Sequence, residues 1–325
     1  MRCHAIRIHA TGGPEVLHWE EVEVGEPGVG EVRLRQTAVG LNYIDTYHRS
    51  GLYPVPLPIG IGLEGAAVVD AVGEQVDDLR VGDRVAYASA PLGAYAEWRL
   101  YPAARLVKLP DAIDDRQAAG MMLQGMTVEY LVRRTYAVQA GQTVLFHAAA
   151  GGVGLIACQW LKHLGATVIG TAGGPEKMAL AREHGCDHVI DYRHEDVASR
   201  VRELTGGAGV PVVYDGVGRD TFQASLDSLA RRGMLVVFGN ASGPVPPFEP
   251  AILSAKGSLY LTRPSLIDYT FTRAELLASA AALFEVVLRG AVRIPVNQTY
   301  ALRDAAQAHR DLEGRKTTGS TVLIP

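Results

Sequence analysis

The chain has 325 residues, of which 48% are hydrophobic and 20% are charged. This length predicts about two domains, and the composition is that of a folded enzyme, which excludes a disordered or fibrous chain. Lys and Arg number 31 against 35 Asp and Glu, so the net charge is -4. An acidic balance gives no long-range attraction to nucleic acid or anionic lipid, and neither is expected as a partner.

The cysteines and the amino terminus both predict a cytoplasmic protein. Cys3, Cys158 and Cys186 are odd in number and scattered, which suits a reducing compartment and offers no disulfide framework. Residues 1–10 mix charged with apolar side chains and lack the apolar core of a signal peptide. No stretch reaches the roughly 20 apolar residues that span a bilayer, so no membrane association is expected.

Residues 1–125 predict a mainly β domain. Short alternating or β-branched runs at 31–41, 65–72 and 83–90 are separated by segments rich in Gly and Pro. Residues 51–62 contain three prolines and form an expected loop.

Residues 126–264 predict a parallel, doubly wound α/β sheet, because strand-like and helix-like segments alternate along the chain. The expected strands are 143–147, 167–171, 188–191, 210–215 and 233–239, and the expected helices are 153–164, 175–184, 195–205 and 222–229. A helix at 273–289 and a strand-like end at 319–325 predict that residues 265–325 return to the first domain.

A glycine-rich turn joins the first strand and helix of this α/β region. Gly151 and Gly152 let the backbone approach a pyrophosphate, Gly154 lets the helix pack on the strand, and the start of the helix offers unpaired N–H groups. Ala149 replaces the first glycine of the usual pattern. Such a turn can serve packing alone, but within a βαβ unit it predicts dinucleotide binding.

The cofactor expected from the next strand end is NADPH. Thr171-Ala172-Gly173-Gly174 lacks the Asp or Glu that would bind the adenosine ribose of NADH. Gly173 and Gly174 leave room and backbone donors, Lys177 can place a cation beside a 2′-phosphate, and Tyr192 can add a hydroxyl donor. The alternative is that Lys177 is an ordinary solvated helix residue.

Several motifs, in order along nearly the whole chain, resemble the bacterial quinone oxidoreductase family, to which lens ζ-crystallin is related. They are NYIDTY at 42–47, RSGLY at 49–53, AAAGGVG at 148–154, VYDGVGRD at 213–220, FGNASG at 238–243 and TRPS at 262–265. The resemblance implies a zinc-free medium-chain dehydrogenase/reductase with a GroES-like catalytic domain and a Rossmann domain, usually a dimer.

No metal is expected, because zinc-containing relatives need thiolate and imidazole ligands that this chain lacks. The position resembling their first ligand is Asn42, and Leu63 stands where a Gly-His-Glu motif has His. Residues 88–98 contain none of the four cysteines of a structural zinc lobe. Without a Lewis acid, alcohol oxidation loses the group that stabilises an alkoxide, whereas a quinone accepts hydride readily.

The resemblance also implies roles for individual residues. The nicotinamide is expected beside Asn42, Thr127 and Tyr130, in the cleft between the domains. Further cofactor contacts are expected at Gly151, Gly152, Val153, Gly173, Gly174, Lys177, Tyr192, Val217, Phe238, Gly239, Asn240, Ser242, Arg263 and Arg315. Glu64 is expected to hydrogen-bond backbone near the cofactor, and His147 to be structural.

Asn42, Tyr47 and Tyr53 are the catalytic candidates, because amide and phenol groups can hydrogen-bond a carbonyl oxygen as negative charge develops on it. The alternative is that the tyrosines only line the domain interface. The predicted function is reduction of a small quinone by NADPH. Two alternatives remain open, a zinc-free enone or enoyl reductase and an NADPH-bound RNA-binding or structural protein.

Overall fold

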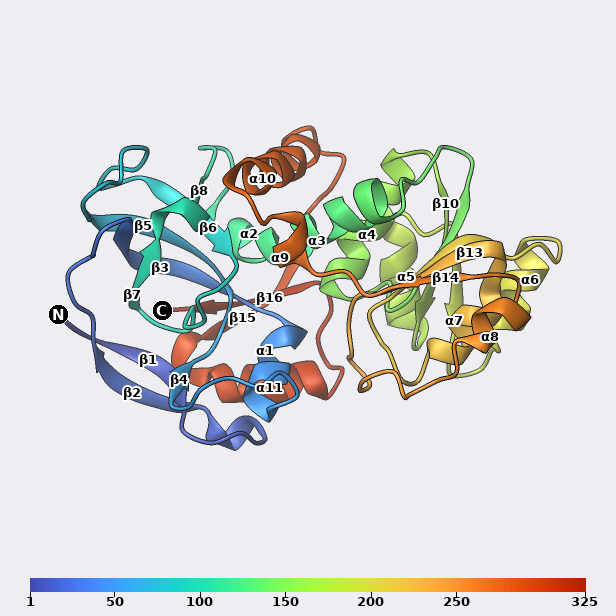
Figure 1. The fold of residues 1–325 in the computed structure, drawn as a ribbon, viewed down its shortest axis with the longest axis horizontal. Coiled ribbons are helices and arrows are strands. Elements are labelled where there is room, and N and C mark those ends of the chain that lie inside the picture. Colours follow the sequence, from blue (N-terminus) through green and yellow to red (C-terminus); the bar gives the residue numbers. More distant parts are fainter. The chain divides into compact units, whose positions relative to one another are not determined.

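The computed structural model describes residues 1–325, which divide into two compact units. Unit 1 contains Met1–Met126, Thr270–Leu288 and Ile294–Pro325, and unit 2 contains Thr127–Tyr269 and Arg289–Arg293. The division falls inside helix α3 (Met122–Tyr130). Figure 1 follows the chain through the elements of each unit.

Unit 1 is built around two sheets (Figure 1). A small sheet has the strand order β2-β1-β4, and a larger one has the order β15-β16-β3-β5-β6-β8, with β7 also paired to β3. The strands are β1 (Arg2–Ile8), β2 (His18–Glu23), β3 (Glu31–Leu41), β4 (Ile59–Gly60), β5 (Glu64–Val72), β6 (Arg84–Ala88), β7 (Trp98–Pro102), β8 (Val107–Lys108), β15 (Val296–Ala301) and β16 (Ser320–Ile324).

β3 organises the larger sheet because it is long and buries alternate side chains. Val32 and Leu34 lie in the apolar core while Arg33 and Arg35, which alternate with them, do not, as a strand with one buried face requires. The strand expected at residues 31–41 is confirmed. β3 pairs antiparallel with β5 and β7, whereas β15 and β16 are parallel to each other.

Four further helices lie within unit 1. They are α1 (Tyr43–Ser50), α2 (Asp115–Ala119), α10 (Arg273–Leu288) and α11 (Ala305–Glu313), with 3-10 turns at Pro14–Val16, Ala103–Arg105 and Leu302–Asp304. Ala305 and Ala308 of α11 enter the same core as β3, which fixes that helix against the sheets.

Unit 2 holds a six-stranded parallel sheet in the order β11-β10-β9-β12-β13-β14, so the predicted doubly wound sheet is confirmed. Its strands are β9 (Thr143–Phe146), β10 (Thr167–Ala172), β11 (His188–Asp191), β12 (Val210–Asp215), β13 (Leu229–Val237) and β14 (Tyr260–Thr262). Its helices are α4 (Gly152–His163), α5 (Pro175–Glu183), α6 (Val197–Leu204), α7 (Phe222–Ser228), α8 (Ala251–Ala255) and α9 (Leu266–Tyr269).

Two parts of unit 2 differ from the sequence prediction. β13 begins at Leu229, four residues before the expected start, because Leu229 already pairs with Val210 ahead of an irregularity in the register. Arg232 sits in that irregular part with φ of 60°. Helix α3 also continues into a π-helical segment at Leu131–Thr135, which no periodic pattern in the sequence predicts.

None of the helices combines the length and the apolar character needed to cross a membrane.

Candidate active site

Asn42 stands at the start of α1 in extended backbone, with φ of -130° and ψ of 156°. Its backbone N–H donates to Oδ2 of Asp45 at 2.9 Å, and this contact stabilises the first turn of the helix. The side chain is 6% exposed. Asn42 is therefore held at a fixed point where β3 passes into α1.

The Asn42 amide is hydrogen-bonded at both ends. Its Nδ2 donates to Oε2 of Glu64 at 2.7 Å, and its Oδ1 accepts from Nε2 of Gln124 at 3.1 Å. Oε1 of Glu64 accepts from the backbone N–H of Leu123 at 2.8 Å, so the expected backbone contact of Glu64 is confirmed. Gln124 was not among the predicted site residues, because a glutamine within an apolar helix gives no signal of its own.

Burial changes the acidity of the two carboxyl groups beside Asn42. It raises the pKa of Glu64 to about 8, against the hydrogen bonds from Asn42 and Leu123 that lower it. It likewise raises the pKa of Asp45 to about 7. Both groups therefore take up protons nearer to neutral pH than exposed carboxylates do.

The structure brings Tyr47 and Tyr53 together. Their ring centroids lie 5.2 Å apart at an interplanar angle of 66°, and the backbone N–H of Tyr53 donates to the carbonyl of Tyr47 at 3.0 Å. Tyr43 lies one turn before Tyr47 with 6.5 Å between the centroids. These rings form an aromatic group on α1 and the loop that follows it.

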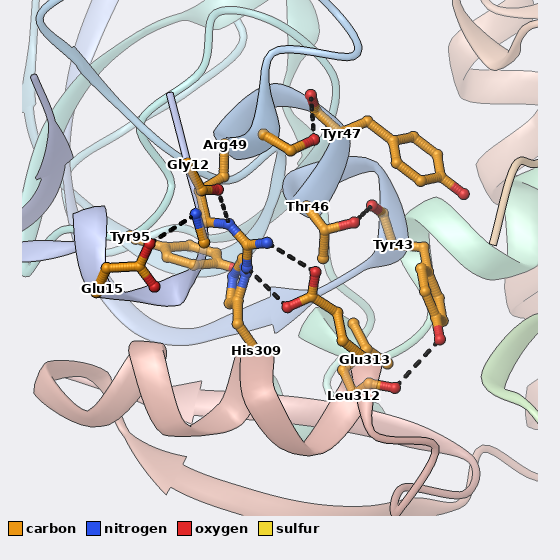
Figure 2. A network of polar contacts seen from close by, with 12 residues as sticks. Gly12, Glu15, Tyr43, Thr46, Tyr47, Arg49, Tyr95, His309, Leu312 and Glu313 are labelled. Carbon is orange, nitrogen blue, oxygen red and sulfur yellow. Dashed lines mark hydrogen bonds and ion pairs between the residues drawn. The ribbon is translucent and has the colours of Figure 1, made fainter. Parts of the chain in front are cut away.

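Figure 2 shows how α1 is fixed on its other side by Arg49. This side chain is 2% exposed and makes a two-pronged ion pair with Glu313 of α11, with N–O distances of 2.7 and 3.0 Å. Its Nε donates to the carbonyl of Gly12 at 3.1 Å, and Nη1 lies 3.0 Å from Nδ1 of His309. The helix that carries Asn42 and Tyr47 is thus tied to α11 and to the loop after β1.

The glycine-rich turn of unit 2 leads from β9 into α4. Gly151 precedes the helix in extended backbone, and its N–H donates to the carbonyl of Ala148 at 3.0 Å. A Cβ on Gly154 would overlap that same carbonyl, so only glycine allows this close approach. The helix therefore starts directly over the turn and leaves its first N–H groups available to an anion.

A second glycine pair follows β10. The hydroxyl of Tyr192 and Nε of Arg193 lie 2.6 and 2.8 Å from where a Cβ on Gly173 would be. β10 ends at Ala172, so no carboxylate stands at this strand end, and Lys177 lies in the first turn of α5, half-buried. Arg193 was not among the predicted contacts of the cofactor, although it directly follows Tyr192 in the chain.

Asp215 organises the loops after β12. Its Oδ1 accepts from the backbone N–H groups of Val217 and Gly218 at 2.8 and 3.0 Å, and Oδ2 accepts from the hydroxyl of Ser225 at 2.7 Å. The hydroxyl of Ser242 donates to the carbonyl of Val217 at 2.9 Å, which joins this loop to the loop after β13.

The remaining predicted contacts of the cofactor lie in different elements of the two units. Thr127 hydrogen-bonds Tyr130, whose ring stacks on Tyr269 at 4.4 Å and has Arg263 nearby. Phe238, Gly239 and Asn240 follow the end of β13, and Arg263 donates to the carbonyl of Val237 at 3.3 Å. Arg315 belongs to unit 1, in an exposed turn after α11 with φ of 57°.

His147 is structural, as expected. It is buried at the end of β9, with its ring nitrogens 3.1 Å from the hydroxyl of Thr171 and 3.0 Å from that of Ser225. Burial lowers its pKa, so it stays neutral and serves as a hydrogen-bonding bridge. No group of three or more His, Cys, Asp or Glu side chains is arranged to hold a metal ion.

The two units are those of a medium-chain dehydrogenase/reductase. Residues 28–111 match the alcohol dehydrogenase GroES-like domain, and residues 152–284 match the zinc-binding dehydrogenase family model. The GroES-like assignment of the first domain is therefore confirmed.

Comparison with individual relatives identifies one family within the medium-chain dehydrogenase/reductases. The chain is 58% identical over 321 residues to a quinone oxidoreductase of Pseudomonas aeruginosa, covering 98% of this chain and 99% of the relative. It is 50% identical over 326 residues to a 2-haloacrylate reductase of a Burkholderia species, covering 98% of each. The crystal structure of Escherichia coli quinone oxidoreductase complexed with NADPH superposes with a TM-score of 0.98 at 50% identity, over 99% of this chain and 100% of that one.

The chain belongs to the quinone oxidoreductase family, and it is an oxidoreductase.

Proposed function

We propose that this enzyme is an NADPH-dependent quinone reductase that passes a hydride to a small quinone without zinc. The observation that carries the proposal is the site after β10. There a tyrosine hydroxyl and an arginine lie against a glycine pair where a carboxylate would select NADH. The quinone oxidoreductase of Escherichia coli, which is 50% identical to this chain, was crystallised with NADPH.

The residues of unit 2 fit this cofactor. The start of α4, with Gly151, Gly152 and Val153, would hold the pyrophosphate through backbone N–H groups. Gly173, Gly174, Lys177, Tyr192 and Arg193 would hold the 2′-phosphate, with two cations and a hydroxyl as its partners. Thr127, Tyr130, Val217, Phe238, Gly239, Asn240, Ser242 and Arg263, together with Asn42 and Arg315 of unit 1, are proposed as further contacts.

Unit 1 supplies the groups that act on the acceptor. When bound, the reduced nicotinamide supplies the hydride. Asn42 has a second amide N–H beyond the one given to Glu64, and this donor would bind the acceptor carbonyl oxygen as negative charge gathers there. The rings of Tyr47 and Tyr53 would stack on a flat acceptor, and the Tyr53 hydroxyl would add a second donor.

A reductase of conjugated double bonds is the second candidate, because a 2-haloacrylate reductase is half identical to this chain. The surroundings of Asn42 favour a neutral acceptor over an acrylate anion. The ionisable side chains that hydrogen-bond Asn42 are Asp45 and Glu64, neither of which can carry a positive charge, and Arg49 is bound to Glu313. An anionic acceptor would meet no compensating cation in these contacts.

The experiment is a steady-state comparison of a simple quinone with an α,β-unsaturated ketone and an acrylate, using NADPH. We expect the highest kcat/KM with the quinone, and higher efficiency with the ketone or acrylate would favour the double-bond reductase. Asn42→Ala and Tyr53→Phe should each lower quinone turnover by about tenfold while NADPH affinity stays nearly unchanged. Unchanged turnover in both variants would remove these residues from the mechanism.

A homodimer in the cytoplasm is the proposed working form. β14 ends the sheet of unit 2 with one side unpaired, which is a surface that a second copy can complete. The odd, scattered cysteines suit a reducing compartment.

RNA binding is not proposed, because the net charge of -4 opposes it; strongly salt-dependent RNA binding in a filter assay would revive it.

A further inference from the structure

A line of four hydrogen-bonded side chains runs through the interior of unit 1 and ends at Glu64. The hydroxyl of Ser320 lies 2.9 Å from Oε1 of Gln124, Nε2 of Gln124 donates to Oδ1 of Asn42 at 3.1 Å, and Nδ2 of Asn42 donates to Oε2 of Glu64 at 2.7 Å. The four residues come from β16, α3, the start of α1 and β5, and none is more than 6% exposed.

Burying four polar side chains away from water costs free energy unless each of them is hydrogen-bonded, so packing alone does not account for this line. An asparagine amide can rotate by half a turn, which exchanges its N–H donors with its carbonyl oxygen at nearly equal volume. Only the donors can bind an acceptor carbonyl oxygen; the exchanged oxygen would repel it. The rotation of Asn42 therefore decides what its side chain offers to the acceptor.

The bonds at the two ends of the amide favour the same rotation. As a carboxylate, Glu64 can only accept, which places the Asn42 nitrogen toward it, and its other oxygen already accepts from the backbone N–H of Leu123. Gln124 donates at the oxygen end, but its own amide can also rotate. Its oxygen faces Ser320, whose single hydroxyl hydrogen reaches either Gln124 or the carbonyl of Gly120 at 2.7 Å. When the Ser320 hydroxyl donates to Gln124, it holds the Gln124 oxygen toward Ser320 and the Gln124 N–H groups toward Asn42.

We infer that Gln124 and Ser320 are positioning residues for quinone reduction, holding the Asn42 amide with one N–H free for the acceptor carbonyl. The inference rests on the proposed role of Asn42. Neither residue touches the acceptor; both act through Asn42. Their loss should reduce kcat for the quinone more than it raises KM, because an orientation that matters in the transition state is lost.

The experiment is a set of double-mutant cycles on the full-length enzyme. We expect Gln124→Met to lower quinone kcat by about tenfold and Ser320→Ala by about threefold, with NADPH affinity in a fluorescence titration within twofold of wild type. In the Asn42→Ala background neither substitution should change the residual kcat further. Thr321→Val is the matched control, because the Thr321 hydroxyl bonds Gln298 and lies outside the line.

The outcomes separate the inference from the proposed function. If Asn42→Ala alone has normal turnover, the role of Asn42 and this inference both fall. If Asn42→Ala is slow while Gln124→Met and Ser320→Ala are normal, only the inference falls. If Gln124→Met lowers kcat by the same factor in the wild-type and Asn42→Ala enzymes, the inference is also overturned, since Gln124 would then act independently of Asn42. Thermal unfolding identifies a variant that fails to fold, and in that case Ser320→Ala decides the question.

Discussion

Arg193 is the residue by which the structure adds most to the prediction of NADPH as the cofactor. The sequence predicts Lys177 and Tyr192 as contacts of the 2′-phosphate, and Arg193 directly follows Tyr192 in the turn after β11. Its backbone N–H donates to Asp191, and its guanidinium lies over Gly173 and Gly174. A planar cation with several donors suits a phosphate better than a single ammonium group does.

At this position we predict that Arg193→Ala raises the Kd of NADPH by about tenfold and leaves that of NADH within twofold, because only NADPH carries the added phosphate. Fluorescence titration of both cofactors checks this. Arg182→Ala is the control, since Arg182 is an exposed cation near the end of α5. The same loss of NADPH affinity in both variants would mean that the effect comes from overall charge.

Helix α1 depends on a polar network that only the fold assembles. The guanidinium of Arg49 can only donate, so Nδ1 of His309 accepts and the ring proton lies on Nε2, 3.1 Å from the hydroxyl of Tyr95. That hydroxyl donates to Asp45 at 2.9 Å, within the first turn of α1. A neutral His309 thus connects α11 to the helix that bears Asn42.

This network predicts a loss of stability in acid. Burial, together with Arg49, lowers the pKa of His309 to about 3, whereas an unfolded histidine has a pKa of about 6.5. Between these values the unfolded chain binds a proton on His309 that the folded chain does not, so the free energy of unfolding falls as the pH drops from about 6.5 toward 3.

His309→Gln should therefore show a smaller fall in Tm than wild type between about pH 7.5 and pH 5, by several degrees. Calorimetry at the two pH values measures the difference. His163→Gln, which changes an exposed histidine of α4, should follow the wild-type slope. Equal slopes for His309→Gln and wild type would show that His309 does not remain neutral in the folded protein.

At the scale of the whole molecule, the open β14 edge of the unit 2 sheet is the surface that we propose for assembly. β14 pairs only with β13, and Tyr260 on it is 59% exposed. An unpaired strand edge with an exposed aromatic side chain is a surface that another copy of the same strand can cover, which removes the free N–H and C=O groups.

We predict that the wild-type enzyme sediments at twice the mass of one chain and that Tyr260→Asp shifts it toward the monomer, because a twofold contact would bring the two new charges together. Sedimentation equilibrium over a range of concentrations checks this. Phe271→Asp is the control, since Phe271 is 71% exposed and lies off β14. A monomeric wild type, or equal dissociation in both variants, would contradict the proposed interface.

Local patterns in the sequence determined much of this protein. The alternation of strands and helices from residue 126, the glycine-rich turn at 151–154 and the missing carboxylate after β10 depend on neighbours along the chain, so they could be predicted before the structure was known. The family motifs added the GroES-like fold, which periodicity alone did not specify.

Only the tertiary structure decided which distant side chains meet. Ser320, Gln124 and Glu64 form one hydrogen-bonded line with Asn42, although up to 278 positions separate them from it, from residue 42 to residue 320, and no periodicity links residues so far apart. The same holds for Arg49 with Glu313, and for Arg193 over Gly173. Strand pairing and helix docking create these contacts, so the orientation of each polar group follows from the fold and not from its neighbours in the chain.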